Sequence, residues 1–290
     1  MRGRAPLLAV AAILVAAGIG LAAWLGGGSS AGTNGSTQRL TSTLQRAPVT
    51  LHVIFPEGFT RADMAERIAA VRSIAIRRRH VRPRLTASGY LEASVSAKAP
   101  AGFKRNPVSR SLEGFLFPAT YDFTQTTTAR DLVADQLAAF RKAFSTVNLR
   151  YAKSKNLTSY DVLTIASMIE KEAVVPSERR LIAAVIYNRL HAKMPLGIDA
   201  TIRYGLHIPG TESLTKKALA SSSPYNTRRF RGLPPTPIAN PGLASIRAAA
   251  HPARVDYLYF VRKPDKRHHF FTASAQEFLR KACEYGFGCR

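Results

Sequence analysis

The chain has 290 residues, of which 46% are hydrophobic, so it can bury the core of one large or two modest globular domains. Its formal net charge of +24 suits anionic surroundings, such as nucleic acid, anionic lipid or an anionic wall polymer. Because the basic residues are spread along the chain and no zinc-finger spacing or nucleotide-binding loop occurs, the sequence argues against a nucleic-acid-binding protein.

An uncharged apolar run from Pro6 to Leu25 is the first predicted element. At about 1.5 Å per helical residue it spans roughly 30 Å, the thickness of a bilayer core. Arg2 and Arg4 precede it and no charge follows until Arg39, so the positive-inside rule places residues 1–5 in the cytoplasm. We therefore expect a single-pass cell-membrane protein whose main region is extracytoplasmic. A cleaved signal peptide is the alternative, although its apolar region is usually shorter, about 7–15 residues.

A small α/β unit is predicted after the membrane anchor. Residues 26–47 are rich in Gly, Ser, Thr and Asn, which is typical of a flexible linker. Alternating apolar residues from Val49 to Phe55 predict a strand, and a Pro-Glu-Gly turn follows it. Thr60 and Asp63 form a capping box, which predicts a helix through Ala70.

A connector is predicted to follow this unit. The dense basic run from Arg77 to Arg84 contains Pro83, which breaks any helix there. Leu85 to Ala93 is predicted to be helical and Ala97 to Pro107 to be a loop. Residues 48–107 are therefore expected to hold the strand-turn-helix unit and its connector.

A larger, mostly helical domain is predicted for residues 108–282. Apolar residues at three- and four-residue spacing predict helices at Ala129–Thr146, Ser159–Val174 and Glu178–His191. Asn240 is predicted to cap a further helix that begins at Pro241 and runs through Ala250.

A β-hairpin and a final helix complete the predicted fold. Asp256 to Val261 alternates as a strand, and His268 to Phe271 is its expected partner across a Pro-Asp turn. Ser274 with Glu277 is predicted to cap the last helix. The expected fold class is α+β, with an N-terminal transmembrane helix, a small α/β unit and a larger helical domain.

The tail, residues 283–290, contains Cys283 and Cys289, which are the chain's two cysteines. In an exported protein they can form a disulfide around a short loop that includes Gly286 and Gly288, or they can remain thiols. No histidine lies near them, so the tail is not expected to bind a metal ion. Nothing else in the sequence predicts a metal ion or a cofactor.

Glu172 is the strongest candidate for a catalytic group. At about 100° per residue, Ile165, Met168 and Ile169 lie within about 60° of Glu172, whereas Glu170 lies about 160° away. A carboxyl that continues a buried apolar stripe should have a raised pKa, as a general acid near neutral pH requires. The alternative is a surface glutamate that pairs with a neighbouring basic residue.

The remaining candidates are polar groups on the helices and loops around this acid. No Gly-x-Ser-x-Gly motif occurs and neither cysteine has the setting of a nucleophile. Proline-stiffened ordered loops often carry binding sites, and Tyr, Asn and Thr suit sugar recognition. Arg189 can hold an anionic substrate group. Asp199 is a candidate for the same site, although it can instead cap a short helix. The candidate binding residues are Asn188, Arg189, Asp199, Tyr225, Asn226 and Thr227.

Six segments, taken in order, resemble the endolytic murein transglycosylase family, also called MltG or YceG-like. The matching segments are LEGFLFPATYDF, IASMIEKEA, SERRLIAAVIYNRL, MPLGIDATIRYG, SPYNTRRFRGLPPTPIANPGLASIRAAAHP and DYLYFV. They cover roughly Leu112 to Phe278. Members of the family usually open with a LysM-like module, of which only Val49–Ala70 is matched here, and Thr236 stands where glycine is common.

The resemblance implies a membrane-anchored lyase that cuts the MurNAc–GlcNAc bond inside nascent peptidoglycan glycan strands. Each cut would leave a 1,6-anhydro-MurNAc end and terminate strand elongation. The family's catalytic acid is the second glutamate of its E-K-E motif, which falls on Glu172. Glu113, another acid in a matching segment, is a further candidate binding residue that would support the site. The implied partners are peptidoglycan strands and, in addition, cell-wall synthases, with no nucleic acid. A non-catalytic peptidoglycan-binding or scaffold membrane protein is the alternative, and an exported nucleic-acid binder is a third hypothesis.

Overall fold

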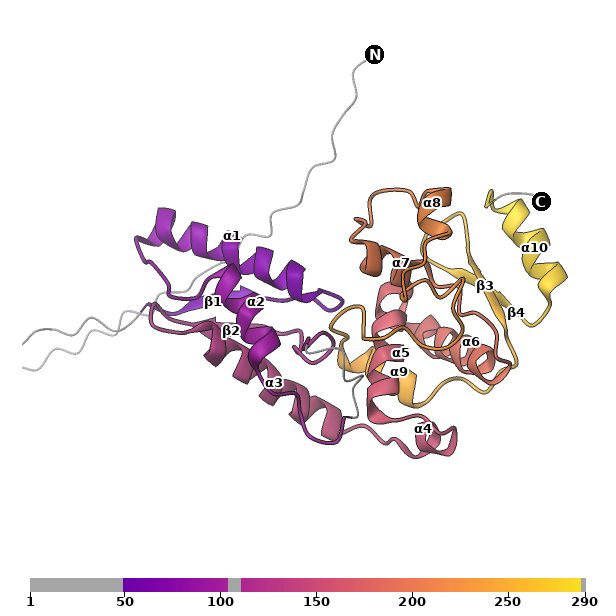
Figure 1. Cartoon of the computed structure of the whole chain (residues 1–290), viewed down its shortest axis with the longest axis horizontal. Coiled ribbons are helices and arrows are strands. Elements are labelled where there is room, and N and C mark those ends of the chain that lie inside the picture. Colours follow the sequence, from indigo (N-terminus) through magenta and orange to yellow (C-terminus); the bar gives the residue numbers. More distant parts are fainter. Residues whose placement is uncertain (1–48, 104–110, 288–290) are drawn as a thin grey trace, which may run out of the picture. The chain divides into compact units, whose positions relative to one another are not determined.

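A computed structural model describes residues 49–103 and 111–287 (Figure 1). The predicted cytoplasmic tail (residues 1–5), transmembrane anchor (6–25) and linker (26–47) lie outside the described residues. Within the described ranges, no helix is both long enough and apolar enough to cross a bilayer.

A two-stranded antiparallel sheet opens the described chain. β1 (Leu51–Ile54) pairs with β2 (Thr120–Phe123), with Leu51 opposite Phe123. Buried and exposed residues alternate along β1, which confirms the predicted strand. Strand β2 is not among the predicted elements, and its pairing with β1 joins residues about seventy positions apart. The small α/β unit therefore takes its second strand from beyond residue 107.

The first helix, α1 (Arg61–Arg79), begins at the predicted capping box. The Thr60 hydroxyl accepts the Asp63 N–H at 3.1 Å, and the Asp63 carboxylate accepts the Thr60 N–H at 2.8 Å. The predicted end at Ala70 is wrong, because the basic residues Arg77–Arg79 form the last turn of this helix. Cations in a last turn interact favourably with the partial negative charge of the helix C-terminus.

Two further helices complete the small unit, α2 (Ala87–Ser96) and α3 (Ala129–Ser145). α1 packs against β1 and α2, and α2 packs against α3. Met64, Tyr90 and Phe140 from these helices are buried in the shared core. The predicted helices at Leu85–Ala93 and Ala129–Thr146 are confirmed as α2 and α3, to within a turn at each end.

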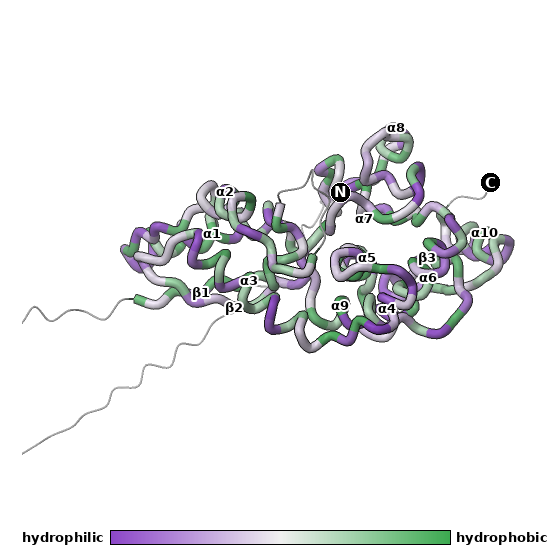
Figure 2. Tube along the Cα trace, turned by 60° about the horizontal axis from the view of Figure 1, so that its bottom comes forward, coloured by the Kyte–Doolittle hydropathy of each residue, from purple (hydrophilic) through white to green (hydrophobic). Residues whose placement is uncertain are grey.

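The central helix of the remaining chain is α5 (Ser159–Glu172), which is buried from Val162 to Ile169. It packs against α6 (Arg179–His191), α7 (Asp199–Leu206) and α9 (Leu243–Ala250). Figures 1 and 2 both show α9 alongside α5. The predicted helices over 159–174 and 178–191 are thus confirmed. The short elements around them are α4 (Arg150–Ser154), the 3₁₀ turn η1 (Pro176–Glu178) and α8 (Lys216–Leu219).

The start of α9 differs from the prediction. Its N-cap is Gly242, and Asn240 is not a cap because its side chain is used elsewhere. Asn240 Oδ1 accepts the backbone N–H groups of Gly114 and Leu116, each at 2.9 Å. Its Nδ2 donates to the carbonyl of Phe59, also at 2.9 Å.

The predicted hairpin is present as β3 (Tyr259–Arg262) and β4 (His269–Thr272), which pair antiparallel. The predicted strand start at Asp256 is too early, because side chains, not strand neighbours, bind the carbonyls just before β3. The last helix, α10 (Ala275–Glu284), begins at the predicted Ser274 cap. The described residues thus have an α+β fold with two separate two-stranded sheets.

One of the two cysteines lies within the described residues. Cys283, in the last turn of α10, is disulfide-bonded. Cys289 lies outside the described residues.

Candidate active site

Glu172 is the last residue of α5. Ile165, Met168 and Ile169, which the helical geometry aligns with it, are all fully buried. Glu172 itself is partly buried. A carboxyl at the exposed end of a buried stripe can meet a substrate while most of its surroundings are protein.

Glu170 occupies a different environment. Its carboxylate accepts the N–H of Gly242 at 3.0 Å, at the N-terminus of α9. Burial and the charge of Glu170 together raise the pKa of the neighbouring Glu57. A carboxylate at a helix N-terminus interacts favourably with the helix dipole, so Glu170 stabilises the packing of α9 on α5.

Burial raises the pKa of Glu172 to about 6. The nearby charges partly offset one another: Arg262 and Arg228 lower this pKa, whereas Asp199 raises it. The backbone N–H of Ala200, in the first turn of α7, also stabilises the ionised form. A carboxyl that titrates this close to neutral pH can donate a proton and later accept one.

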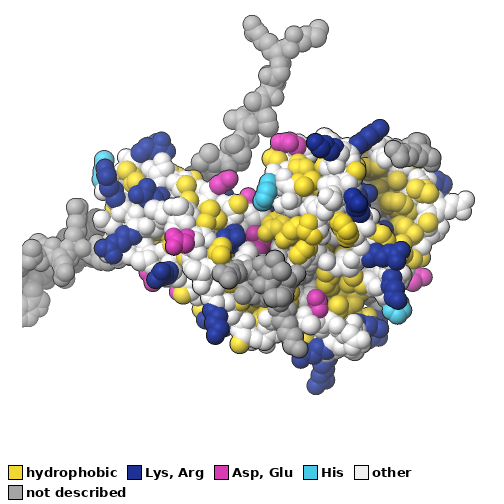
Figure 3. Space-filling view, in the orientation of Figure 1, with side chains coloured by type: hydrophobic (Ala, Val, Ile, Leu, Met, Phe, Trp, Pro, Cys, Tyr) yellow, Lys and Arg dark blue, Asp and Glu magenta, His cyan; other side chains and the backbone are white. Residues whose placement is uncertain are grey.

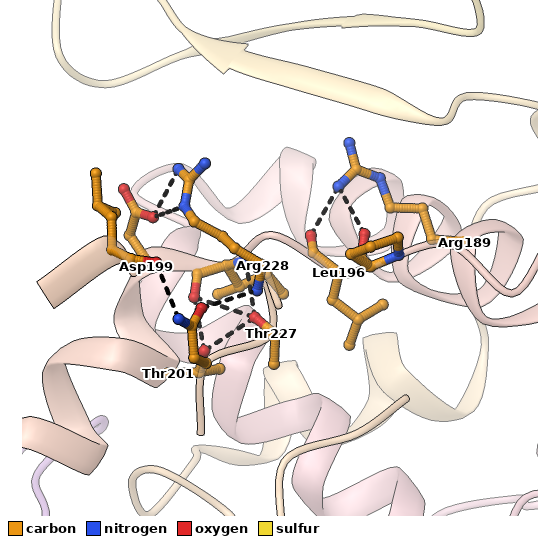
Figure 4. A network of polar contacts seen from close by, with 10 residues as sticks. Arg189, Leu196, Asp199, Thr201, Thr227 and Arg228 are labelled. Atoms are coloured by element: carbon orange, nitrogen blue, oxygen red, sulfur yellow. Dashed lines mark hydrogen bonds and ion pairs between the residues drawn. The ribbon is translucent and has the colours of Figure 1, made fainter. Parts of the chain in front are cut away.

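Asp199 and Arg228 form an ion pair beside this acid (Figure 4). Arg228 Nη2 and Nε each lie 2.7 Å from Asp199 Oδ1. Both side chains are nearly half exposed, so solvent screens the pair. Asp199 is the first residue of the short helix α7, whose N-cap is Ile198, and a carboxylate there interacts favourably with the helix dipole.

Thr227 fastens the loop that carries Arg228 to the start of α7 (Figure 4). The Thr227 hydroxyl accepts the N–H of Ile198 at 3.1 Å and lies 3.0 Å from the hydroxyl of Thr201. The Thr227 carbonyl accepts the N–H of Gly197 at 2.9 Å. Because Thr227 is buried, these bonds hold the groups beside Glu172 from within the protein.

Asn226 and Tyr225 support the same loop. Asn226 is fully buried, and its Nδ2 donates to the carbonyls of Leu219 and Ser221, each at 2.9 Å. The Tyr225 hydroxyl lies 2.8 Å from the hydroxyl of Thr236. The donor groups of Asn226 are therefore engaged by the backbone, whereas Tyr225 stays partly exposed.

Asn188 and Arg189 anchor the segment that leads into β3. Asn188 Nδ2 donates to the carbonyls of Val255 and Tyr257, each at 2.9 Å. Arg189 Nη1 donates to the carbonyl of Leu196 at 2.8 Å (Figure 4). Burial lowers the pKa of Arg189. With their donors on backbone carbonyls, both side chains are placed to hold the scaffold of the site.

Glu113 is buried at a junction of three segments. Its carboxylate accepts from the Arg61 N–H at 3.1 Å, from Asn240 Nδ2 at 2.8 Å and from the Tyr204 hydroxyl at 3.1 Å. Burial raises its pKa to about 7. Since Glu113 is only 3% exposed, the geometry favours an indirect role, in which it positions α7 through Tyr204.

The structure places Asp199 near Glu172. The other predicted residues hydrogen-bond the loops and helices that carry the site. Arg228, Arg262 and the Ala200 N–H are groups near the acid that sequence reasoning missed. Arg228 directly follows a predicted binding loop, which was a usable signal, but nothing local places the end of β3 near α5. Among residues 49–103 and 111–287, no group of three or more His, Cys, Asp or Glu side chains is placed to hold a metal ion.

Fold and site together define an α+β protein built around one partly buried carboxylic acid at the end of its core helix. The chain belongs to the YceG-like family, whose model matches residues 30–284.

Similar proteins come from several bacteria. An endolytic murein transglycosylase of Streptococcus pneumoniae strain R6 is 33% identical over an alignment of 276 residues, and the match covers 86% of this chain and 48% of the relative. One from Bacillus subtilis strain 168 is 42% identical over 164 residues, which are 56% of this chain and 44% of the relative. The chain thus spans about half the length of the curated relatives it matches.

A solved structure supports the same assignment. The crystal structure of a YceG-like protein from Listeria monocytogenes is similar with a TM-score of 0.66 and 29% sequence identity. The match covers 79% of this chain and 75% of the Listeria chain.

Proposed function

We propose that this protein is an endolytic lytic transglycosylase that cleaves peptidoglycan glycan strands, with Glu172 as its catalytic acid. The observation that carries this proposal is the position of Glu172 at the end of a buried helix, where burial raises the pKa of its carboxyl to about 6. The names of the relatives from two bacterial genera, each an endolytic murein transglycosylase, support it.

Bond cleavage begins with proton transfer. Protonated Glu172 donates its proton to the oxygen of the MurNAc–GlcNAc bond, and the bond between C1 of MurNAc and that oxygen breaks. Positive charge then develops on C1. The carboxylate of Asp199 lies near enough to Glu172 to raise its pKa, and its negative charge stabilises this oxocarbenium-like state.

Ring closure completes the reaction without water. The 6-hydroxyl of the same MurNAc attacks C1, and the Glu172 carboxylate takes the hydroxyl proton as the new C1–O bond forms. Glycosidases that use water commonly need two carboxylates, whereas here the substrate supplies the nucleophile. One acid that alternates between its two protonation states is therefore sufficient, and Glu172 is regenerated as an acid.

The surroundings of the substrate follow from the same proposal. A transmembrane anchor at residues 6–25 would hold the enzyme at the outer face of the cell membrane, close to cell-wall synthases and nascent strands. Lys and Arg side chains are scattered over the face shown in Figure 3 and do not form a single stripe. Diffuse positive charge suits a disperse anionic wall polymer better than a nucleic-acid duplex, which would need a single basic stripe.

Val49–Ala70 would act as a truncated LysM-like unit.

Incubation of the purified full chain with uncrosslinked glycan strands in H₂¹⁸O tests the reaction type. We expect new 1,6-anhydro-MurNAc ends in mass spectra, with no ¹⁸O in them because no water enters the product. Products that carry ¹⁸O would identify a hydrolase and overturn the proposal. If the protein sediments with peptidoglycan but no new glycan ends form, the result would instead support a wall-binding scaffold.

The pH profile of product formation reports on Glu172. Since the first step needs protonated Glu172, the rate of product formation should fall as the pH rises through about 6. One pH unit above this pKa, the rate should be roughly one tenth of its value at low pH. Asp199→Asn removes a charge that raises this pKa, so the falling limb should move to lower pH. Asp122→Asn is the matched control, because Asp122 pairs with the exposed His52 on the small unit. An unmoved limb in Asp199→Asn would show that Asp199 does not act on the acid.

A further inference from the structure

A buried pair, Glu178 and His269, has no part in the proposed chemistry. Glu178 Oε2 lies 2.7 Å from His269 Nδ1, and Glu178 Oε1 accepts the backbone N–H of His269 at 2.8 Å. The two side chains are only 9% and 2% exposed, respectively. A two-point contact between buried polar groups holds its partners in one relative position, because breaking either bond leaves a buried group unsatisfied.

The pair connects the end of the catalytic helix region to the hairpin. Glu178 is the last residue of η1, the turn between α5 and α6, and it follows Glu172 closely along the chain. His269 is the first residue of β4. The contact therefore fixes the start of β4 relative to the chain segment that carries Glu172.

The strand register carries this constraint to Arg262. His269 lies directly opposite Arg262 in the antiparallel pair, and opposed residues project their side chains from the same face of the sheet. Phe260, on the same face, packs edge-on against the His269 ring with 5.3 Å between ring centroids. The position of His269 thus sets the position of the end of β3.

Arg262 lies near enough to Glu172 to stabilise its carboxylate. The other groups that act on this carboxyl are Asp199 and the Ala200 N–H from α7, and Arg228 from the loop before α9. Asn188 bonds the segment before β3 and Arg189 stacks on the ring of Tyr259 at the start of β3, whereas the Glu178–His269 pair fixes β4 to η1.

We infer that Glu178 and His269 are positioning residues that hold Arg262 beside the catalytic acid through the β3–β4 hairpin. The inference rests on the proposed function, in which Glu172 must give up its proton. A guanidinium at a set distance favours the carboxylate that remains after this step. If the hairpin moves, this stabilisation is lost while the acid itself stays in place.

Titration of the Glu172 carboxyl by ¹³C NMR on the full chain, alongside the pH profile of product formation, tests the inference. Arg262→Gln should raise the Glu172 pKa and move the falling limb to higher pH, on the order of 0.5–1 unit. His269→Gln and Glu178→Gln should each move both quantities in the same direction. The double variant Arg262→Gln/His269→Gln should move them no further than Arg262→Gln alone.

His268→Gln is the matched control, because His268 is the neighbouring histidine and its ring Nδ1 bonds the exposed Asp265 in the hairpin turn. It should leave the Glu172 titration unchanged. A Glu172 titration that moves in Arg262→Gln but not in folded His269→Gln or Glu178→Gln would overturn the inference. The NMR titration needs no substrate, so it gives a result even if the wild-type chain forms no anhydro ends, which would count against the proposed function alone.

Discussion

Replacement of Glu172 by glutamine is expected to abolish formation of 1,6-anhydro-MurNAc ends. The amide has nearly the same shape as the carboxyl, but it cannot donate a proton to the glycosidic oxygen or take one from the 6-hydroxyl. Loss of general acid–base catalysis of this kind lowers rates by about 10²–10⁴-fold or more. Mass spectrometry of digested glycan strands measures the product, and circular dichroism checks that the variant is folded.

Glu170→Gln is the matched comparison for this variant. Glu170 belongs to the same helix, but its carboxylate accepts the N–H of Gly242 at the start of α9. We expect Glu170→Gln to retain product formation with a small loss of stability. Full activity in Glu172→Gln would show that Glu172 is not the catalytic acid. Loss of product only in Glu170→Gln would assign the catalytic role to Glu170.

Asn240→Ala is expected to be the most destabilising single substitution considered for this fold. Asn240 is fully buried, and its amide bonds the N–H groups of Gly114 and Leu116, the Phe59 carbonyl and the Glu113 carboxylate. Alanine would leave these buried groups without partners and open a small cavity. Together these losses should lower the free energy of unfolding by about 3–5 kcal/mol. Urea unfolding of the full chain measures the change.

Asn148→Ala provides the control for this substitution. Asn148 is exposed, and its Oδ1 accepts the N–H of Arg150 at 2.9 Å. We expect it to cost about 1 kcal/mol or less. If Asn240→Ala costs no more than this control, the buried bonds around Asn240 do not stabilise the junction as the geometry indicates.

Local signals predicted most of the helical fold. The capping box at Thr60 and Asp63, and the apolar spacing along α5, depend only on residues a few positions apart, so the sequence displays them. β2 and the start of α9 depend on distant partners. Asn240 is a residue type that often caps helices, but here its Oδ1 accepts the N–H groups of Gly114 and Leu116 instead.

The candidate site likewise has one part that local residue spacing predicts and another part that depends on distant contacts. The difference between Glu172 and Glu170 is a difference of helical face, which residue spacing alone predicts. The contribution of Arg262 depends on where a hairpin ninety residues downstream (172 to 262) packs against α6, the helix that follows α5. Likewise, the sequence marks Asn188 as a polar residue near the acid, but only the structure shows that its donors bind the backbone carbonyls before β3.

We expect the Thr227 contacts to keep the geometry of the acid unchanged when the length of the largely exposed segment 209–214 changes. One end of this segment is fixed where the Ile208 N–H bonds the Arg203 carbonyl at 2.9 Å, and the other where Asn226 bonds the carbonyl of Leu219. Each doubling of a flexible loop costs only about 0.6 kcal/mol of closure free energy. Insertions, affinity tags or whole recognition modules can therefore be placed in this segment without disturbing Asp199, Ala200 and Arg228 around Glu172.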